Sequence, residues 1–235
     1  GIQLIRHEDI LSFDEITEVA RIAVEMGVRK VRITGGEPLV RKGIVNLVKM
    51  IAEIPGVDDL SMTTNGILLA QFAEQLKEAG LHRINVSLDT LDPEKYSLIT
   101  RGGNVDDVLS GLMKAAETGF SPIKINCVTG EMTDDSDAIA VRAYGEKNGF
   151  QVRFIRQMDL ATGEFYIVEG GEGGNCRMCN RLRLTSNGMI KPCLFNAIGY
   201  NVRELGAREA ILRAIDNKPR CGTFNPDEEF YQLGG

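Results

Sequence analysis

The segment KVRITGGEPL at residues 30–39 decides the fold class, because a run of β-branched and aliphatic residues leads directly into a Gly-Gly-Glu-Pro turn. Four further runs have the same strand character: 59–64, 83–88, 123–128 and 151–156. Helical patterns separate these runs, and each ends at a glycine shortly before the next strand: 12–26, 70–79, 106–118 and 137–148. We therefore predict an α/β fold with a parallel sheet and right-handed crossovers. Active sites of such folds lie at the carboxyl ends of the strands.

The composition excludes several classes of protein. The 235 residues suit one large or two small domains, and 43% of them are hydrophobic without any long apolar run. A net charge of −6 gives no support for nucleic-acid binding. We find no signal peptide or transmembrane segment, and the five cysteines are clustered at metal-like spacing. We therefore expect a cytoplasmic protein in a reducing compartment, with no membrane or nucleic-acid partner.

Beyond residue 160 the pattern changes, which predicts a second domain. Glycine-rich loops, a cysteine-containing hairpin and a helix near 202–216 replace the alternation of strands and helices. We expect a first domain over residues 1–160 and a smaller one over 161–235.

Three cysteines of this second part follow the spacing Cys-x2-Cys-x13-Cys: Cys176, Cys179 and Cys193. Between them, Asn187-Gly188 is flanked by alternating apolar residues, which is the strongest short signal for a tight hairpin. The hairpin would return Cys193 to the other two thiols. Three thiolates suit a structural zinc site with Cys221 as fourth ligand, or an iron–sulfur cluster with one open position. The spacing alone leaves both open, together with the absence of any metal.

Two features of the first part indicate ligand binding. Gly35 and Gly36 lack Cβ, so a ligand can approach their backbone, and their carbonyls together with Glu37 suit an ammonium group. Lys124 lies within an otherwise apolar strand, where an ammonium group needs an anionic partner. By contrast, we expect Cys127 on the same strand to be a core residue.

Taken in order, these motifs resemble those of the GTP 3′,8-cyclase family of radical S-adenosylmethionine enzymes. The resemblance covers residues 1–158 and 176–235, and it rests on the segments RITGGEPL (32–39), TTNG (63–66), NVSLDTLD (85–92), KIN (124–126), RFI (153–155), the cysteine hairpin and LGG (233–235). It implies a partial parallel (β/α) barrel and a small C-terminal domain with an auxiliary cluster. It also implies a lyase reaction, in which a 4Fe–4S cluster cleaves S-adenosylmethionine and the resulting radical converts GTP to the cyclic pterin precursor of molybdenum cofactor.

The resemblance further implies the roles of individual residues. Those that match contacts to S-adenosylmethionine are Gly36, Ser87 and Met158. Those that match contacts to GTP are Arg32, Thr63, Lys124, Arg181 and Arg183, with Arg153 as a further candidate for the phosphates. A second 4Fe–4S cluster would be held by Cys176, Cys179 and Cys193, and the tail residues Gly234 and Gly235 would enter the substrate site and act in catalysis. The implied partners are GTP, a downstream cyclic pterin synthase and a second copy of the chain in a homodimer.

The sequence departs from the family at two places. The family binds its first cluster through a Cys-x3-Cys-x2-Cys loop after the first strand, but no cysteine precedes Cys127 here. The family also carries several dozen more residues between Met158 and Cys176. We therefore expect the printed chain to lack the first strand and the first cluster site, and to be inactive as it stands.

Two other functions fit part of the pattern. A different radical S-adenosylmethionine enzyme with an auxiliary cluster, such as a peptide maturase, would share the barrel motifs. A non-catalytic zinc-binding scaffold would share the cysteine spacing. Arg181 and Arg183 argue against a peptide substrate, because alternate residues of a strand point to one face and two guanidinium forks suit a triphosphate.

Overall fold

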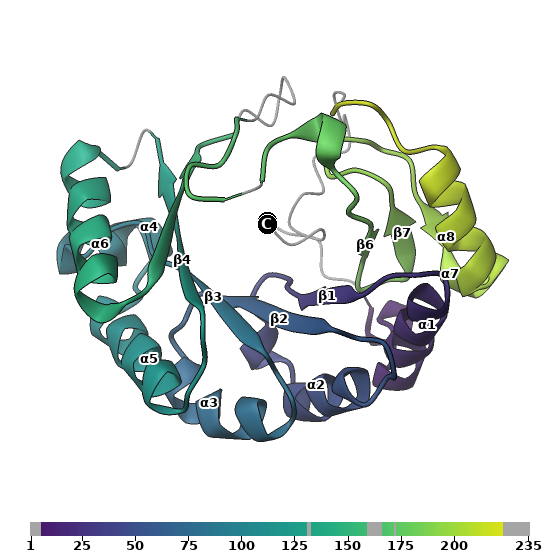
Figure 1. Ribbon diagram of the computed structural model, residues 1–235, viewed down its shortest axis with the longest axis horizontal. Helices are drawn as coiled ribbons and strands as arrows, with labels where there is room; N and C mark the ends of the chain where they lie inside the picture. The colour runs from purple at the N-terminus through teal and green to yellow at the C-terminus, as the bar shows by residue number, and fades with distance from the viewer. Residues whose placement is uncertain (1–5, 131–132, 159–165, 172, 223–235) are drawn as a thin grey trace.

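The fold is an α/β partial barrel with one parallel sheet (Figure 1). The computed structural model describes residues 6–130, 133–158, 166–171 and 173–222. Its five-stranded sheet has the order β1-β2-β3-β4-β5, formed by β1 Lys30–Ile33, β2 Asp59–Thr64, β3 Arg83–Ser87, β4 Ile123–Thr129 and β5 Gln151–Arg156. Every neighbouring pair is parallel, as the sequence predicted, and each strand lies within a residue or so of its predicted bounds.

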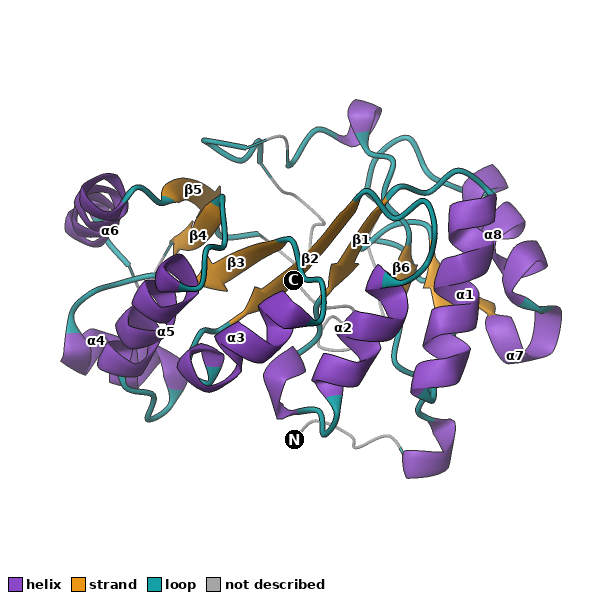
Figure 2. Cartoon of the chain, turned by 60° about the horizontal axis from the view of Figure 1, so that its bottom comes forward, coloured by secondary structure: helices purple, strands orange, loops and turns teal. Residues whose placement is uncertain are grey.

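Helices cover the outer face of this curved sheet (Figures 1 and 2). They are α1 Phe13–Glu25, α2 Ile44–Ala52, α3 Leu69–Glu78, α4 Pro93–Thr100, α5 Val105–Glu117 and α6 Asp135–Asn148, with short 3-10 turns η1 His7–Asp9 and η2 Pro38–Val40. A capping box begins α1, because the Ser12 side chain accepts from the Glu15 N–H while the Glu15 carboxylate accepts from the Ser12 N–H. The sequence analysis did not predict α2 and α4.

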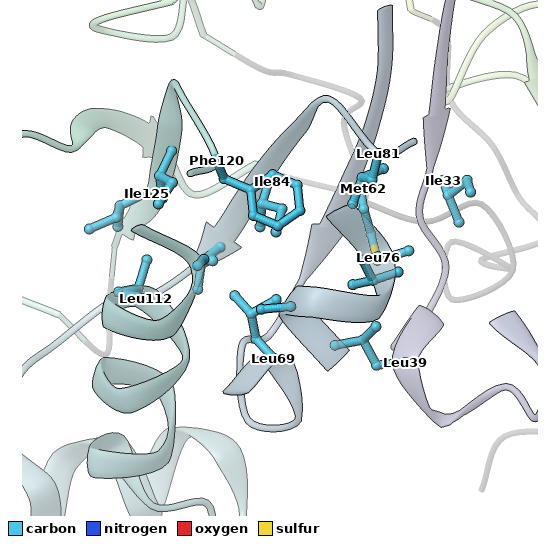
Figure 3. Close-up of a cluster of buried hydrophobic side chains, with 14 of the residues drawn as sticks. Ile33, Leu39, Met62, Leu69, Leu76, Leu81, Ile84, Leu112, Phe120 and Ile125 are labelled. Carbon is cyan, nitrogen blue, oxygen red and sulfur yellow. The ribbon is translucent and has the colours of Figure 1, made fainter. Parts of the chain in front are cut away.

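The two faces of the sheet differ sharply in polarity. The outward-facing residues of the central strands are fully buried against the helices. They are Leu60, Met62, Ile84, Val86 and Ile125. Figure 3 shows strand residues such as Met62 and Ile84 meeting helix residues such as Leu76 and Leu112. Truncating one of these side chains to alanine would cost about 2–5 kcal/mol. Most of the apolar core therefore lies outside the sheet, and the inner face is left for other chemistry.

The C-terminal part forms a three-stranded antiparallel sheet that packs on α1. Its elements are η3 Cys176–Met178, β6 Arg183–Leu184, β7 Met189–Lys191, β8 Tyr200–Asn201, α7 Val202–Leu205 and α8 Ala207–Asp216. The predicted hairpin at Asn187-Gly188 is confirmed by the β6–β7 pairing. The predicted helix over 202–216 is interrupted at Gly206, whose φ of 78° falls outside the helical region. A second apolar cluster joins Leu11 and Val19 to Ile190 and Ile211.

None of the helices that the structure describes is long and apolar enough to cross a lipid bilayer.

Candidate active site

The inner face of the parallel sheet is lined by polar side chains from all five strands. The strand register arranges them in three rows: Arg32, Ser61 and Arg83; Thr63, Asn85 and Lys124; and Ser87, Asn126 and Arg153. Alternation along each strand explains this arrangement, because successive residues point to opposite faces. The structure therefore brings the predicted nucleotide residues of the first part, Arg32, Thr63, Lys124 and Arg153, onto one face.

The residues predicted for S-adenosylmethionine lie at the carboxyl edge of the same sheet. Gly36 belongs to the turn after β1, Ser87 is the exposed last residue of β3, and Met158 is half-buried just beyond β5. Gly35 has φ of 153°, a backbone conformation that favours glycine. A Cβ added at Gly36 would meet no atom of the described residues within 4 Å, so none of them covers the backbone there. A ligand can therefore come close to this turn.

Glu37 has a different role from the one its charge indicated in the sequence. Its Oε1 accepts hydrogen bonds from Thr64 Oγ1 at 2.7 Å and from the Leu39 N–H at 3.0 Å. Its Oε2 accepts from the Asn65 N–H at 2.6 Å. Because three donors already occupy the carboxylate, Glu37 fastens the glycine turn to the end of β2. It thereby positions Gly36 beside the neighbouring strand.

Two cations of the inner face, Arg32 and Lys124, have pKa values below their ordinary ones. Burial lowers the pKa of Arg32 most, followed by the charges of Arg181, Arg153 and Arg83. The pKa of Lys124 is also below its ordinary value, because of burial first and then of Arg153, Arg83 and Arg32. In both cases Asp59 opposes the shift, but this carboxylate is already bound to Arg83 through two hydrogen bonds. The inner face is thus a site of unbalanced positive charge.

The two arginines of the C-terminal part add to this charge. Arg181 precedes β6 and is exposed, whereas Arg183 begins β6 and is half-buried. Burial, followed by the charge of Arg181, lowers the pKa of Arg183. Across the part of the chain that is described, no carboxylate lies within 4.0 Å of the charged nitrogens of Arg32, Lys124, Arg181 or Arg183. These four cations are therefore available to an anionic ligand.

The three clustered cysteines lie next to these arginines. None of them forms a disulfide, and Cys179 is exposed while Cys176 and Cys193 are half-buried. The β6–β7 ladder pairs Arg183 with Lys191, so the antiparallel register leads Cys193 back towards Cys179. Within the described ranges, however, no group of three or more histidine, cysteine, aspartate or glutamate side chains is arranged to hold a metal ion. The convergence of the three thiols stays a prediction.

The surroundings of Cys179 favour its metal-binding form. Burial works to raise the pKa of this thiol, but a hydrogen bond from the Arg181 backbone and the charges of Lys218, Arg181 and Arg183 lower it below its usual value. A thiolate is the form that binds metals. Cys127 contrasts with it, since burial raises the pKa of that thiol to about 12, and its 0% exposure confirms the expected core position. The donor chemistry of the hairpin thus fits a thiolate-bound metal or cluster.

Gly234 and Gly235, predicted to act in catalysis, lie outside the described residues.

Five inner-face residues were missed by the sequence analysis: Asp59, Ser61, Arg83, Asn85 and Asn126. Asn85 is 2% exposed and its Nδ2 donates to the Met62 carbonyl at 3.2 Å. The signal that would have found them is a polar residue at every second position of a parallel strand, because both faces of a parallel sheet are usually apolar.

Comparisons with known proteins agree with this geometry. The Radical SAM superfamily profile matches residues 3–143. A GTP 3′,8-cyclase of Peptoclostridium acidaminophilum is 37% identical over 291 residues, covering 100% of this chain and 89% of the relative. Because this alignment is longer than the 235-residue chain, that relative carries additional residues within the matched region. Another, from Alkaliphilus metalliredigens, is 39% identical over 83% of this chain and 74% of its own length.

Solved structures show the same fold at low sequence identity. Native anSMEcpe with bound AdoMet and a Kp18Cys peptide has a TM-score of 0.61 at 14% identity, covering 92% of this chain and 73% of that one. Methylornithine synthase (PylB) has a TM-score of 0.55 at 21% identity, covering 66% of this chain, which spans only 46% of that structure.

The polar inner face, the open glycine turn and the profile match together define a radical SAM protein. The two curated relatives described above are more than one third identical to this chain over most of both lengths. Both are GTP 3′,8-cyclases, which identifies the family within this superfamily. The chain belongs to the GTP 3′,8-cyclase family of the Radical SAM superfamily.

Proposed function

We propose that the intact protein is a GTP 3′,8-cyclase that converts GTP to the cyclic pterin precursor of molybdenum cofactor. The observation that carries this proposal is the group of cations Arg32, Lys124, Arg181 and Arg183, contributed by both parts of the chain. A nucleoside triphosphate carries several negative charges, and guanidinium forks match its oxygens in pairs. A peptide substrate would not require such a concentration of positive charge.

Two regions of the site divide the work of binding. The inner face, with Arg32, Thr63, Lys124 and Arg153, would hold the nucleotide, with Arg181 and Arg183 covering its phosphates. The carboxyl edge would hold S-adenosylmethionine, with the backbone of Gly36 near its methionine part, the Ser87 hydroxyl as a polar contact and Met158 against the adenine. S-adenosylmethionine held there beside a 4Fe–4S cluster would supply the radical chemistry, and the sheet residues would orient the GTP ribose towards it. Holding both molecules on one rigid sheet would orient them for this transfer.

The hairpin cysteines would hold the second cluster. Cys176, Cys179 and Cys193 are free thiols, the register returns one arm to the other, and the pKa of Cys179 favours thiolate. Three protein ligands leave one iron for the substrate, whereas a structural zinc site would be closed by a fourth ligand. Gly234 and Gly235 would complete the substrate site. The product would pass to a cyclic pterin synthase, and a homodimer in the cytoplasm remains our prediction.

A test requires the full-length protein, reconstituted without oxygen. It would be incubated with GTP, S-adenosylmethionine and a reductant, and both 5′-deoxyadenosine and the cyclised product would be measured. We expect both products from the wild type, two clusters per chain by iron and sulfide analysis, and loss of the cyclised product in Lys124→Met.

A matched control is Arg213→Ala, which removes an exposed pair with Glu209 on α8 and should leave turnover unchanged. Release of 5′-deoxyadenosine with a peptide but not with GTP would support the maturase alternative. Stoichiometric zinc without iron would support the scaffold and refute the proposal.

A further inference from the structure

Lys218 joins the two arms of the cysteine hairpin. It follows α8 and is half-buried. Its Nζ donates a hydrogen bond of 2.7 Å to the Arg181 carbonyl and one of 2.6 Å to the Pro192 carbonyl. These two acceptors lie on opposite arms of the hairpin. One side chain, remote in sequence from either arm, therefore holds both.

The position of this contact is informative. The β6–β7 ladder ends at the pair Arg183 and Lys191, on the side towards the cysteines. The Arg181 and Pro192 carbonyls lie beyond that pair, where the ladder no longer fixes the distance between the arms. Two hydrogen bonds from one ammonium group take the place of the missing rung. Pro192 has no N–H and cannot donate a ladder bond to the opposite arm, so the bonds from Lys218 connect the two arms there.

The end of α8 does not explain this contact. Asn217 Nδ2 donates to the Arg213 carbonyl at 2.9 Å, and the Lys218 N–H donates to the Ile215 carbonyl at 3.1 Å. The helix terminus thus uses the backbone of Lys218 and leaves its side chain free for the hairpin. Burying the ammonium group costs free energy unless its donors are satisfied, so both carbonyls are needed.

We propose that Lys218 is a positioning residue that sets the separation of Cys179 and Cys193 for the second iron–sulfur cluster, an inference that rests on the proposed function. Arg181 is two residues after Cys179, and Pro192 directly precedes Cys193. Fixing these two carbonyls fixes the backbone from which both thiols project. The same contact orients the backbone at Arg181, whose side chain would bind the phosphates.

The test compares the full-length wild type with Lys218→Met, Lys218→Arg and the control Arg220→Met. Arg220 is an exposed cation two residues away with no hydrogen-bond partner in the described part of the chain. After anaerobic reconstitution, we would measure iron per chain, the rate of iron release to a chelator, and the electron paramagnetic resonance signal of the second cluster with and without GTP. Supporting residues around a metal site typically contribute about 10- to 100-fold in affinity.

We expect Lys218→Met to release the iron of the second cluster about 10- to 100-fold faster and to lose its GTP-dependent signal. Lys218→Arg, which can still donate to two carbonyls, should keep both properties, and Arg220→Met should match the wild type. If wild type and Lys218→Met hold the second cluster equally well, the inference is wrong while the proposed function stands. If the wild type holds no second cluster, the proposed function fails and the inference falls with it.

If Lys218→Met does not fold, Lys218→Ser, whose short polar side chain cannot reach either carbonyl, replaces it. An unchanged rate of iron release in that variant would overturn the inference.

Discussion

Replacing Lys124 by methionine should stabilise the ligand-free protein and weaken GTP binding. The pKa of Lys124 is lowered by burial and then by Arg153, Arg83 and Arg32. A folded pKa below the unfolded value of 10.5 means that folding disfavours the charged form. The penalty is therefore fully present below the folded pKa, and it disappears as the pH rises towards 10.5. At pH 7 the charge of Lys124 costs stability whenever no anion is bound.

The size of this effect follows from the neighbouring charges. One like charge about 7 Å away contributes about 1–2 kcal/mol of repulsion at an effective dielectric constant of 20 to 40. Lys124 is only half-buried, and the charge of Asp59 offsets part of the repulsion. The free energy of unfolding of Lys124→Met should therefore exceed that of the wild type by about 1 kcal/mol. That corresponds to a rise of about 2–4 °C in the melting temperature. Loss of a charge-assisted contact of about 1.5–3 kcal/mol should weaken GTP binding about tenfold to a hundredfold.

The assay is unfolding of both proteins, alone and with GTP or inorganic tripolyphosphate. Lys124→Met should unfold at a higher temperature alone, and saturating GTP should reverse the order. The control Lys77→Met should unfold at a lower temperature than the wild type when no ligand is present. Lys77 Nζ donates to the Gly119 carbonyl at 3.0 Å and lies 4.9 Å from the centre of the Phe120 ring, and the variant loses both contacts. A less stable ligand-free Lys124→Met with an undiminished response to GTP would refute the reasoning.

Three further outcomes are expected. Arg181→Ala and Arg183→Ala should each weaken GTP binding about tenfold to a hundredfold in calorimetry and reduce the salt dependence of that binding. The melting temperature of each variant should change by a few degrees at most. Gly36→Val should weaken S-adenosylmethionine binding at least about tenfold and leave GTP affinity unchanged, since a Cβ there meets no atom of the described residues. Arg203→Ala should slightly lower the free energy of unfolding at pH 7, because Arg203 bonds both Glu15 oxygens in a partly exposed pair. The hydrogen bond from Arg203, followed by one from the Ser12 N–H, lowers the pKa of Glu15 from 4.5 to about 2, so the difference in denaturant titrations should shrink as the pH falls through that range. An equal difference at pH 7 and pH 2 would contradict this last expectation.

Much of the fold could be predicted because its signals are local. The strands are runs of β-branched residues, and glycines mark the turns between helices and strands, which short-range steric rules explain. Helix α2 was missed although Ile44, Leu47, Val48 and Ile51 follow helical spacing, since its β-branched residues are equally common in strands. Helix α4 has little amphipathic pattern and one buried residue, Tyr96, and only its Asp92 cap and Pro93 marked its start.

Local patterns also predict part of the candidate site, whereas its other contacts depend on the tertiary structure. Gly36, Ser87 and Lys124 lie at strand ends or within strands, so predicting the strands also predicted which edge or face they share. The bond between Asp59 and Arg83 needs the cross-strand register, which no local pattern provides. Lys218 is 37 residues from Arg181 and 26 residues from Pro192 in the sequence. It bonds their backbone carbonyls, which every residue type has and which therefore give no residue-specific signal. Long-range bonds to the backbone cannot be predicted from one sequence.

The assignment of substrate depends on side chains rather than on the backbone. A structure solved with a peptide shares this fold at 14% identity, so the arrangement of strands is compatible with more than one substrate class. What separates this chain is the charge on its inner face, where Arg32 and Lys124 repel each other in the absence of a ligand. Folding alone would not favour such a group, because its repulsion costs stability and Asp59, which is bonded to Arg83, offsets only part of it. An anion bound there would recover this free energy, so the site would favour a polyanionic substrate, as our proposal of a nucleoside triphosphate requires.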